Sequence, residues 1–95
     1  MAAYVIAEVN VTDPVLFEEY RKIVPATIEK YGGSYEVRGG AAETLEGGWS
    51  PARVVVLEFP SIEQARKWYR SPEYAPGLAI RLRAASTNAI LVEGI

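Results

Sequence analysis

The segments of this chain that resemble β-strands are apolar on both faces. Residues 53–59 give the clearest strand pattern and residues 87–93 the last one. Successive side chains of a strand point to opposite faces, and aliphatic side chains fill both: Val54 and Val56 against Val55, Leu57 and Phe59, and Ile90 and Val92 against Leu91. An antiparallel sheet with one face in water alternates apolar and polar residues instead. The chain therefore has to cover both faces of its sheet.

The remaining segments complete a β-α-β-β-α-β order. We expect strand 4–11, helix 14–31, strand 34–38, strand 53–59, a helix from residue 62 that stops and restarts at Ser71-Pro72, and strand 87–93. Two right-handed crossovers and a central hairpin arrange this order into an α+β, ferredoxin-like fold with an antiparallel four-stranded sheet of order 4-1-3-2. The helices of this fold cover only one face of the sheet.

The first helix has clear ends and a broad apolar stripe. Thr12-Asp13-Pro14 offers a capping side chain and a proline for the first helical position, and Gly32-Gly33 is typical of a left-handed end. Pro25 lies inside the helix, where proline removes a hydrogen bond. The stripe follows Leu16, Tyr20, Ile23, Thr27 and Tyr31 and is widened by Phe17, Val24 and Ile28.

The length of 95 residues predicts one domain, residues 1–95, rather than two. A chain of this size buries only about 60–65% of the surface that its unfolded form exposes, so its core is marginal. The chain has no cysteine, and disulfides therefore cannot support the fold. A second copy of the chain would add buried area and cover the second sheet face, which predicts a homodimer.

Charge and hydropathy exclude several kinds of partner. The net charge is −2, from 10 basic and 12 acidic side chains without a run of one sign, which argues against nucleic-acid binding. No apolar run approaches the ~20 residues that span a bilayer. The start, Met1-Ala2-Ala3-Tyr4, lacks the basic segment of a signal peptide. We expect a cytoplasmic protein without a membrane or nucleic-acid partner.

The absence of histidine and cysteine restricts the chemistry. Neither a Ser-His-Asp triad, nor a Cys-His pair, nor a His/Cys metal cluster can be assembled. The three Gly-Gly pairs fit neither a phosphate loop nor a dinucleotide fingerprint. We therefore expect no cofactor and no metal, and any proton transfer would use Glu, Asp, Tyr, Lys or water beside arginine.

Several short runs, spread over nearly the whole chain, carry a family resemblance. They are Tyr31-Gly32-Gly33, Val37-Arg38-Gly39-Gly40, Leu45-Glu46-Gly47-Gly48-Trp49 with Arg53, the strand Val54–Pro60, the run Ala65–Tyr74, and Arg81. Together they resemble the uncharacterised family DUF1330. The resemblance implies one domain with a dimeric α/β-barrel fold, in which two ferredoxin-like sheets pack face to face. It implies no established reaction.

The wider superfamily is similar in fold to cofactor-free monooxygenases, muconolactone-isomerase-like proteins, chlorite-dismutase-like haem proteins and stress-response barrels. Such breadth of fold is not evidence of function. The haem members use a histidine as iron ligand. Since this chain has none, histidine-ligated haem is excluded.

Two carboxylates and two arginines are candidate ligand-binding residues. Glu8 and Glu58 interrupt otherwise apolar strands, where a carboxylate is expected only if it is paired or lines a cavity. Their strands are neighbours in the 4-1-3-2 order, which would bring them close. Arg38 and Arg53 flank the long loop 41–52 and could clamp an anion through bidentate bonds. The alternative is that these four groups form structural ion pairs.

Aromatic residues supply the other candidates. Trp49 lies in a Gly-Gly-Trp-Ser-Pro loop and would cap a pocket or, as we slightly favour, anchor a dimer. Trp68 recurs at helical spacing with Ala65 and is expected in the core. Tyr69 and Tyr74 join the ligand-binding candidates.

Two functions follow from these residues, and the sequence leaves open whether the protein is an enzyme. In the first, the dimer binds a small hydrophobic or anionic molecule in a pocket, with cofactor-free catalysis as a further step. In the second, the protein is a structural or regulatory dimer without catalysis, whose polar residues form interface ion pairs.

Overall fold

The computed structural model describes residues 1–95 as four strands and three helices. In chain order these are β1 (Ala3–Val11), α1 (Pro14–Lys30), β2 (Ser34–Arg38), β3 (Val54–Phe59), α2 (Ile62–Tyr69), α3 (Ala75–Ala84) and β4 (Ala85–Glu93). All strand pairs are antiparallel, in the order β2-β3-β1-β4. Viewed from the other edge, this is the predicted order 4-1-3-2. The ferredoxin-like fold is confirmed, with its second helix interrupted as expected.

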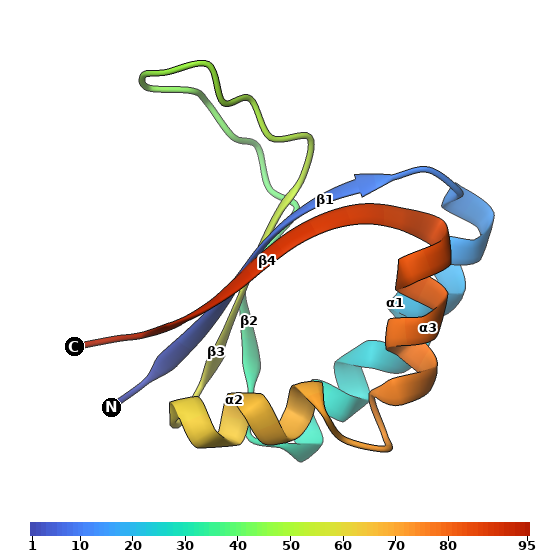
Figure 1. Cartoon of the computed structure of the whole chain (residues 1–95), viewed down its shortest axis with the longest axis vertical. Coiled ribbons are helices and arrows are strands. Elements are labelled where there is room, and N and C mark those ends of the chain that lie inside the picture. The colour runs from blue at the N-terminus through green and yellow to red at the C-terminus, as the bar shows by residue number, and fades with distance from the viewer.

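The three helices lie on one side of a curved sheet, and the connection between β2 and β3 projects away as a long loop (Figure 1). The sheet therefore has an inner face, which the helices cover, and an outer face. Along β1, Val5, Ala7 and Val9 belong to the inner face, where they line a cavity. The residues between them belong to the outer face.

α1 begins and ends where the sequence predicts, but a different part of its stripe is buried. Asp13 caps the helix by accepting the Leu16 N–H at 3.1 Å. The buried residues are Phe17, Val24 and Ile28, whereas Ile23 is 39% exposed. Leu16, Tyr20 and Tyr31 of the predicted stripe pack against the core as expected, and Ile23 is the exception. α3 packs against α1 at Gly77, where an added Cβ would lie 2.7 Å from Val24 Cγ2, so the Val24 side of α1 faces α3.

Trp68 lies at the centre of the core, as predicted. Its ring lies between Phe59 and Tyr74, with centroids 5.4 and 4.1 Å away, and only 2% of the residue is exposed. Its indole Nε1 donates to Thr27 Oγ1 at 3.0 Å, because a buried indole N–H requires an acceptor. Ser71 closes the turn into α3 by donating to the Trp68 carbonyl at 2.7 Å.

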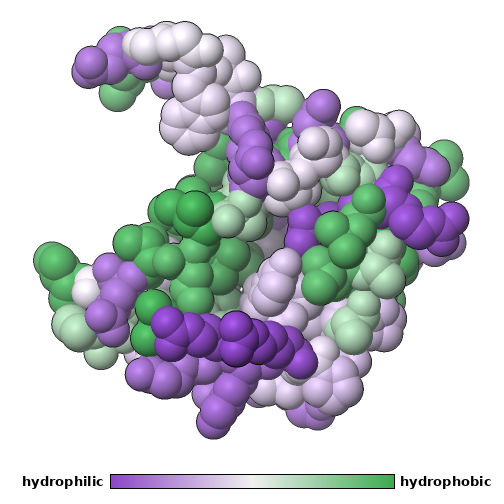
Figure 2. Space-filling view, in the orientation of Figure 1, coloured by the Kyte–Doolittle hydropathy of each residue, from purple (hydrophilic) through white to green (hydrophobic).

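The outer face carries an apolar patch and lacks a helical cover. Ile90 is 61% exposed and Val92 41% exposed on β4, and Val37 is 38% exposed on β2. Figure 2 shows hydrophobic residues gathered on the sheet beneath the projecting loop. This patch is therefore the apolar surface that the helices leave uncovered.

None of the helices is long and apolar enough to cross a membrane.

An exposed charge cluster fastens the end of α1 to the turn between α2 and α3. The Glu73 carboxylate accepts from Lys30 Nζ at 2.6 Å and from the Tyr31 hydroxyl at 2.7 Å. These two hydrogen bonds favour the ionised form and lower the pKa of Glu73 from 4.5 to about 2.

This depressed pKa gives a pH-dependent contribution to stability. The contribution is complete above pH 4.5 and is lost as the pH falls from 4.5 through about 2. In this range the Glu73 carboxylate is ionised in the folded state but takes up a proton in the unfolded state. In an NMR titration, Lys30→Ala should raise the pKa of Glu73 toward 4.5, and Tyr31→Phe should raise it less. Lys67→Ala, a lysine without a contact to this carboxylate, is the control. An unchanged Glu73 titration in Lys30→Ala would contradict the interpretation.

Candidate functional site

A cavity opens between the inner face of the sheet and the helices, and every strand and helix contributes to its wall. The cavity has an accessible volume of about 70 Å³, which is enough for roughly five water molecules. Fourteen of the nineteen lining residues are hydrophobic, so the remaining five decide which polar groups it accepts: Arg21, Arg38, Arg53, Arg81 and Thr87.

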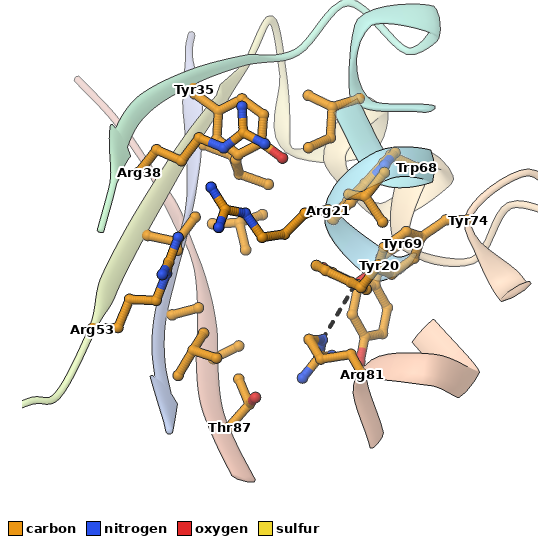
Figure 3. A pocket seen from close by; sticks show the side chains of 18 of the residues that line it. Tyr20, Arg21, Tyr35, Arg38, Arg53, Trp68, Tyr69, Tyr74, Arg81 and Thr87 are labelled. Carbon is orange, nitrogen blue, oxygen red and sulfur yellow. Dashed lines mark hydrogen bonds between the residues drawn. The ribbon is translucent and has the colours of Figure 1, made fainter. Parts of the chain in front are cut away.

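The cavity holds four arginines and no carboxylate (Figure 3). Arg21 pairs with Glu18 at 3.1 Å on the surface, whereas the other three form no ion pair. Arg81 is only 7% exposed, and Arg53 Nε is buried without a hydrogen-bond partner. Guanidinium groups remain charged at all relevant pH values, and burying an unpaired cation is costly. The cavity therefore contains positively charged hydrogen-bond donors that have no anionic partner within the chain.

A β-bulge directs Arg38 into the cavity. The pairing of β2 with β3 shifts between Tyr35 and Val37, so that Tyr35 lies opposite Leu57 and Arg38 opposite Val55. Residues three apart in a regular strand point to opposite faces, and the extra residue of the bulge places both on the inner face. The Arg38 guanidinium then lies 4.4 Å from the centroid of the Tyr35 ring, in the range of a cation–π contact.

A glycine makes room for Arg53. Gly39 has a φ of +72°, and a Cβ there would lie 2.9 Å from Arg53 Cζ and Nε. Only glycine adopts this conformation without strain while letting the guanidinium approach its backbone. The Arg53 guanidinium also lies 5.8 Å from the centroid of the Phe17 ring. The Gly-Gly pair after β2 thus contributes to the position of an arginine.

The deepest arginine is joined to two tyrosines. Arg81 Nε donates to the Tyr74 hydroxyl at 3.4 Å, and the Tyr74 and Tyr20 hydroxyls are 3.0 Å apart. Burial raises the pKa of Tyr20, and the neighbouring Tyr74 raises it further; burial also raises the pKa of Tyr35. Burial lowers the pKa of Arg81, but the Tyr74 hydrogen bond and the nearby phenols raise it overall. Tyr20 and Tyr35 stay uncharged beside a permanent cation.

Three of the candidates predicted from the sequence lie outside the cavity: Glu8, Trp49 and Glu58. Glu8 is an outer-face residue of β1, where its carboxylate accepts from Trp49 Nε1 at 2.8 Å and from Asn88 Nδ2 at 3.2 Å. Glu58 accepts from the Tyr4 hydroxyl at 3.2 Å and lies opposite Tyr4, four residues before Glu8 on the paired strand. The expectation that the two carboxylates lie close together was wrong, because the register separates them.

The other four candidates line the cavity: Arg38, Arg53, Tyr69 and Tyr74. The sequence reasoning missed Arg21 and Arg81 as ligand-binding candidates. A signal for Arg81 existed, since it shares the buried side of α3 with Gly77 and Ala84 at spacings of four and three. A charged residue on the buried side of a helix is expected only where it is paired or lines a cavity. The carboxylates of the chain form no group that could hold a metal ion.

Comparison with known proteins identifies a family and a fold. The sequence model described as "Domain of unknown function (DUF1330)" matches residues 2–95. No curated protein matches the sequence.

Three solved structures are similar over almost the whole chain. The RPA0582 protein of unknown function from Rhodopseudomonas palustris has a TM-score of 0.75 and 18% identity, covering 99% of this chain and 82% of that one. SnoaB, a cofactor-independent oxygenase from Streptomyces nogalater, has a TM-score of 0.68 and 12% identity, with 99% and 93% covered. A dimeric protein of unknown function with a ferredoxin-like fold from Bacteroides fragilis has a TM-score of 0.60 and 13% identity, with 98% and 96% covered. At these identities the likeness shows the fold.

The contact between Gly39 and Arg53 can be tested by comparing two glycines with positive φ. Gly39→Ala and Gly47→Ala should each lose about 1–2 kcal/mol of unfolding free energy through left-handed strain, measured by urea denaturation. Gly47 has no atom within 4 Å of an added Cβ, so only Gly39→Ala should shift the NMR signal of the Arg53 Nε–H. An Arg53 signal unchanged in Gly39→Ala would show that the glycine does not position this arginine.

Proposed function

The chain belongs to the DUF1330 family, named for its unknown function, and we propose that this member binds a small organic anion with an apolar body. The ligand occupies the cavity between the sheet and the helices. The observation that carries the proposal is the set of four arginines in a cavity without a carboxylate.

Unpaired cations support the anionic part of this ligand. Arg81 is buried with a single long hydrogen bond, to a tyrosine hydroxyl, and Arg53 has a buried N–H without an acceptor. An anion would neutralise charge and accept these donors together, and charge-assisted hydrogen bonds are about twice as strong as neutral ones. A carboxylate, sulfonate or phosphate group would supply the acceptors that these arginine donors lack within the chain.

The hydrophobic lining supports the apolar part. Aliphatic side chains such as Val5, Val55 and Leu57 come from the sheet, and the rings of Trp68 and Tyr69 come from α2. Small-molecule sites are commonly apolar clefts with a few polar groups that fix orientation. The limited interior volume favours a single aromatic ring or a short aliphatic chain.

The geometry favours binding over proton-abstracting catalysis. The cavity contains neither histidine nor carboxylate, and burial raises the pKa of Tyr20, so its phenol is a weak proton acceptor near neutral pH. Glu8 and Glu58, the carboxylates first considered for this role, lie on the outer face. Cofactor-free catalysis, as in the oxygenase SnoaB, would have to use the arginines to stabilise an anion that forms on the substrate.

The outer face supports a homodimer. Its apolar residues include Ile90 and Val92, both more than two-fifths exposed, and large exposed apolar patches usually mark an interface. The structurally similar Bacteroides fragilis protein is dimeric with this fold. Glu8, Glu58 and Trp49 would then lie at or near the interface, where the structural alternative places ion pairs and a tryptophan anchor.

Ligand binding can be tested with acids and their matched amides. Benzoate, phenylacetate and hexanoate should raise the melting temperature of the protein, while benzamide, phenylacetamide and hexanamide should bind at least about tenfold more weakly because they lack the charge. Ala7→Leu, at a partly buried cavity residue of β1, should fill the cavity and abolish the shifts. Ala75→Leu, outside the cavity, should retain them. The absence of any acid-dependent shift in the wild type would overturn the proposal.

The dimer can be tested on the two sides of the molecule. Ile90→Glu places a charge on the outer face and should convert the protein to a monomer in sedimentation analysis. Leu82 is 68% exposed on α3, on the helical side, and Leu82→Glu is the matched control that should stay dimeric. An unchanged molecular mass in Ile90→Glu would argue against this interface.

A further inference from the structure

Two orphaned polar atoms of the structure lie on one rung of the sheet. The buried side-chain atoms without a hydrogen-bond partner are Arg53 Nε and Thr87 Oγ1. Val9 connects them: its N–H donates to the Arg53 carbonyl at 2.8 Å, and it pairs with Thr87 across β1 and β4. Arg53 and Thr87 therefore flank the same residue of the central strand, on the inner face.

Arg81 completes this group from the opposite wall. Figure 3 shows Arg53 and Thr87 on the sheet side of the cavity and Arg81 facing them from α3. Arg81 is 7% exposed and donates only its Nε, to Tyr74, so its terminal nitrogens have no partner in the chain. Arg21 and Arg38 differ, because both are exposed residues and belong to the mouth of the cavity.

We propose that Arg53, Thr87 and Arg81 form the seat for the ligand's charged group, and that this group is a carboxylate. The inference rests on the proposed function and says where in the cavity the anion binds. Two guanidinium groups and one hydroxyl can donate to the two oxygens of a planar carboxylate. A phosphate would bring further oxygens into a wall that is otherwise hydrophobic, where each unpaired polar atom is costly.

The seat also orients the rest of the ligand. With the carboxylate at the Arg53–Thr87 rung, the apolar body extends along the sheet toward Val55 and Leu57 and toward the ring of Trp68. Arg38, stacked on Tyr35, lies opposite Val55 and therefore flanks the apolar body rather than the carboxylate.

Acetate is the probe for the seat, because it carries the charged group and almost no apolar body. Arginine Nε–H signals in ¹H–¹⁵N spectra should respond to acetate exchanged for chloride at constant ionic strength. We expect saturable shifts for Arg53 and Arg81 and none for Arg83, an exposed arginine outside the cavity. Shifts at Arg38 or Arg21 instead would overturn the seat but leave the proposed function standing. The absence of any saturable shift would overturn the seat. The proposed function would then be decided separately, by whether benzoate, phenylacetate or hexanoate raises the melting temperature.

Thr87→Val separates a binding role from a structural one. The substitution keeps the shape and removes the hydroxyl, so acetate affinity should fall roughly 3- to 15-fold. The melting temperature of the empty protein should not fall, since an unpaired buried hydroxyl contributes nothing to folding. Thr87→Ser, which retains the hydroxyl, should keep the affinity. Unchanged acetate affinity in Thr87→Val, or a loss of stability without a loss of affinity, would contradict the assignment.

Discussion

Successive side chains of β1 point to opposite faces of the sheet, and β1 pairs with both β3 and β4. This alternation sorts the functional residues of the whole molecule. Val9 brings Arg53 and Thr87 together on the inner face, and Glu8, its immediate neighbour, joins Trp49 and Asn88 on the outer face. A slip of one residue in either pairing would exchange the two sets. The proposed ligand site and the proposed dimer surface thus lie on opposite sides of one strand.

The fold could be predicted from the sequence because its determinants are local. The apolar run within 53–59, the cap at Asp13 and the glycines after α1 each depend on a few adjacent residues, and all are present in the structure. Trp68 was assigned to the core from its helical spacing alone. The exposure of Ile23 on α1 was the exception. It depends on where α3 approaches, through Gly77 and Val24, which are 53 residues apart in the sequence.

The site could be predicted only in part, because it is assembled from residues on every element. Arginines near the long loop suggested an anion site, and two of them do line the cavity. Glu8 and Glu58 were expected to lie close to each other because their strands are neighbours, but the register separates them. The inward direction of Arg38 depends on a bulge that has no glycine or proline signal at its position. Arg81 stood out only as a charge on an otherwise small helix face.

The junction between α3 and β4 has a consequence for how a ligand reaches the cavity. α3 ends at Ala84 and β4 begins at Ala85 without an intervening residue, and the Ala84 carbonyl accepts the N–H groups of Thr12 and Asp13 at 2.8 and 3.0 Å. A joint without a loop, tied to the start of α1, restrains α3 at its C-terminal end. A ligand would enter and leave past Arg21 and Arg38, because exposed side chains change rotamer within nanoseconds. If the proposed ligand binds, the side chains of Arg21 and Arg38 would control its access to the cavity.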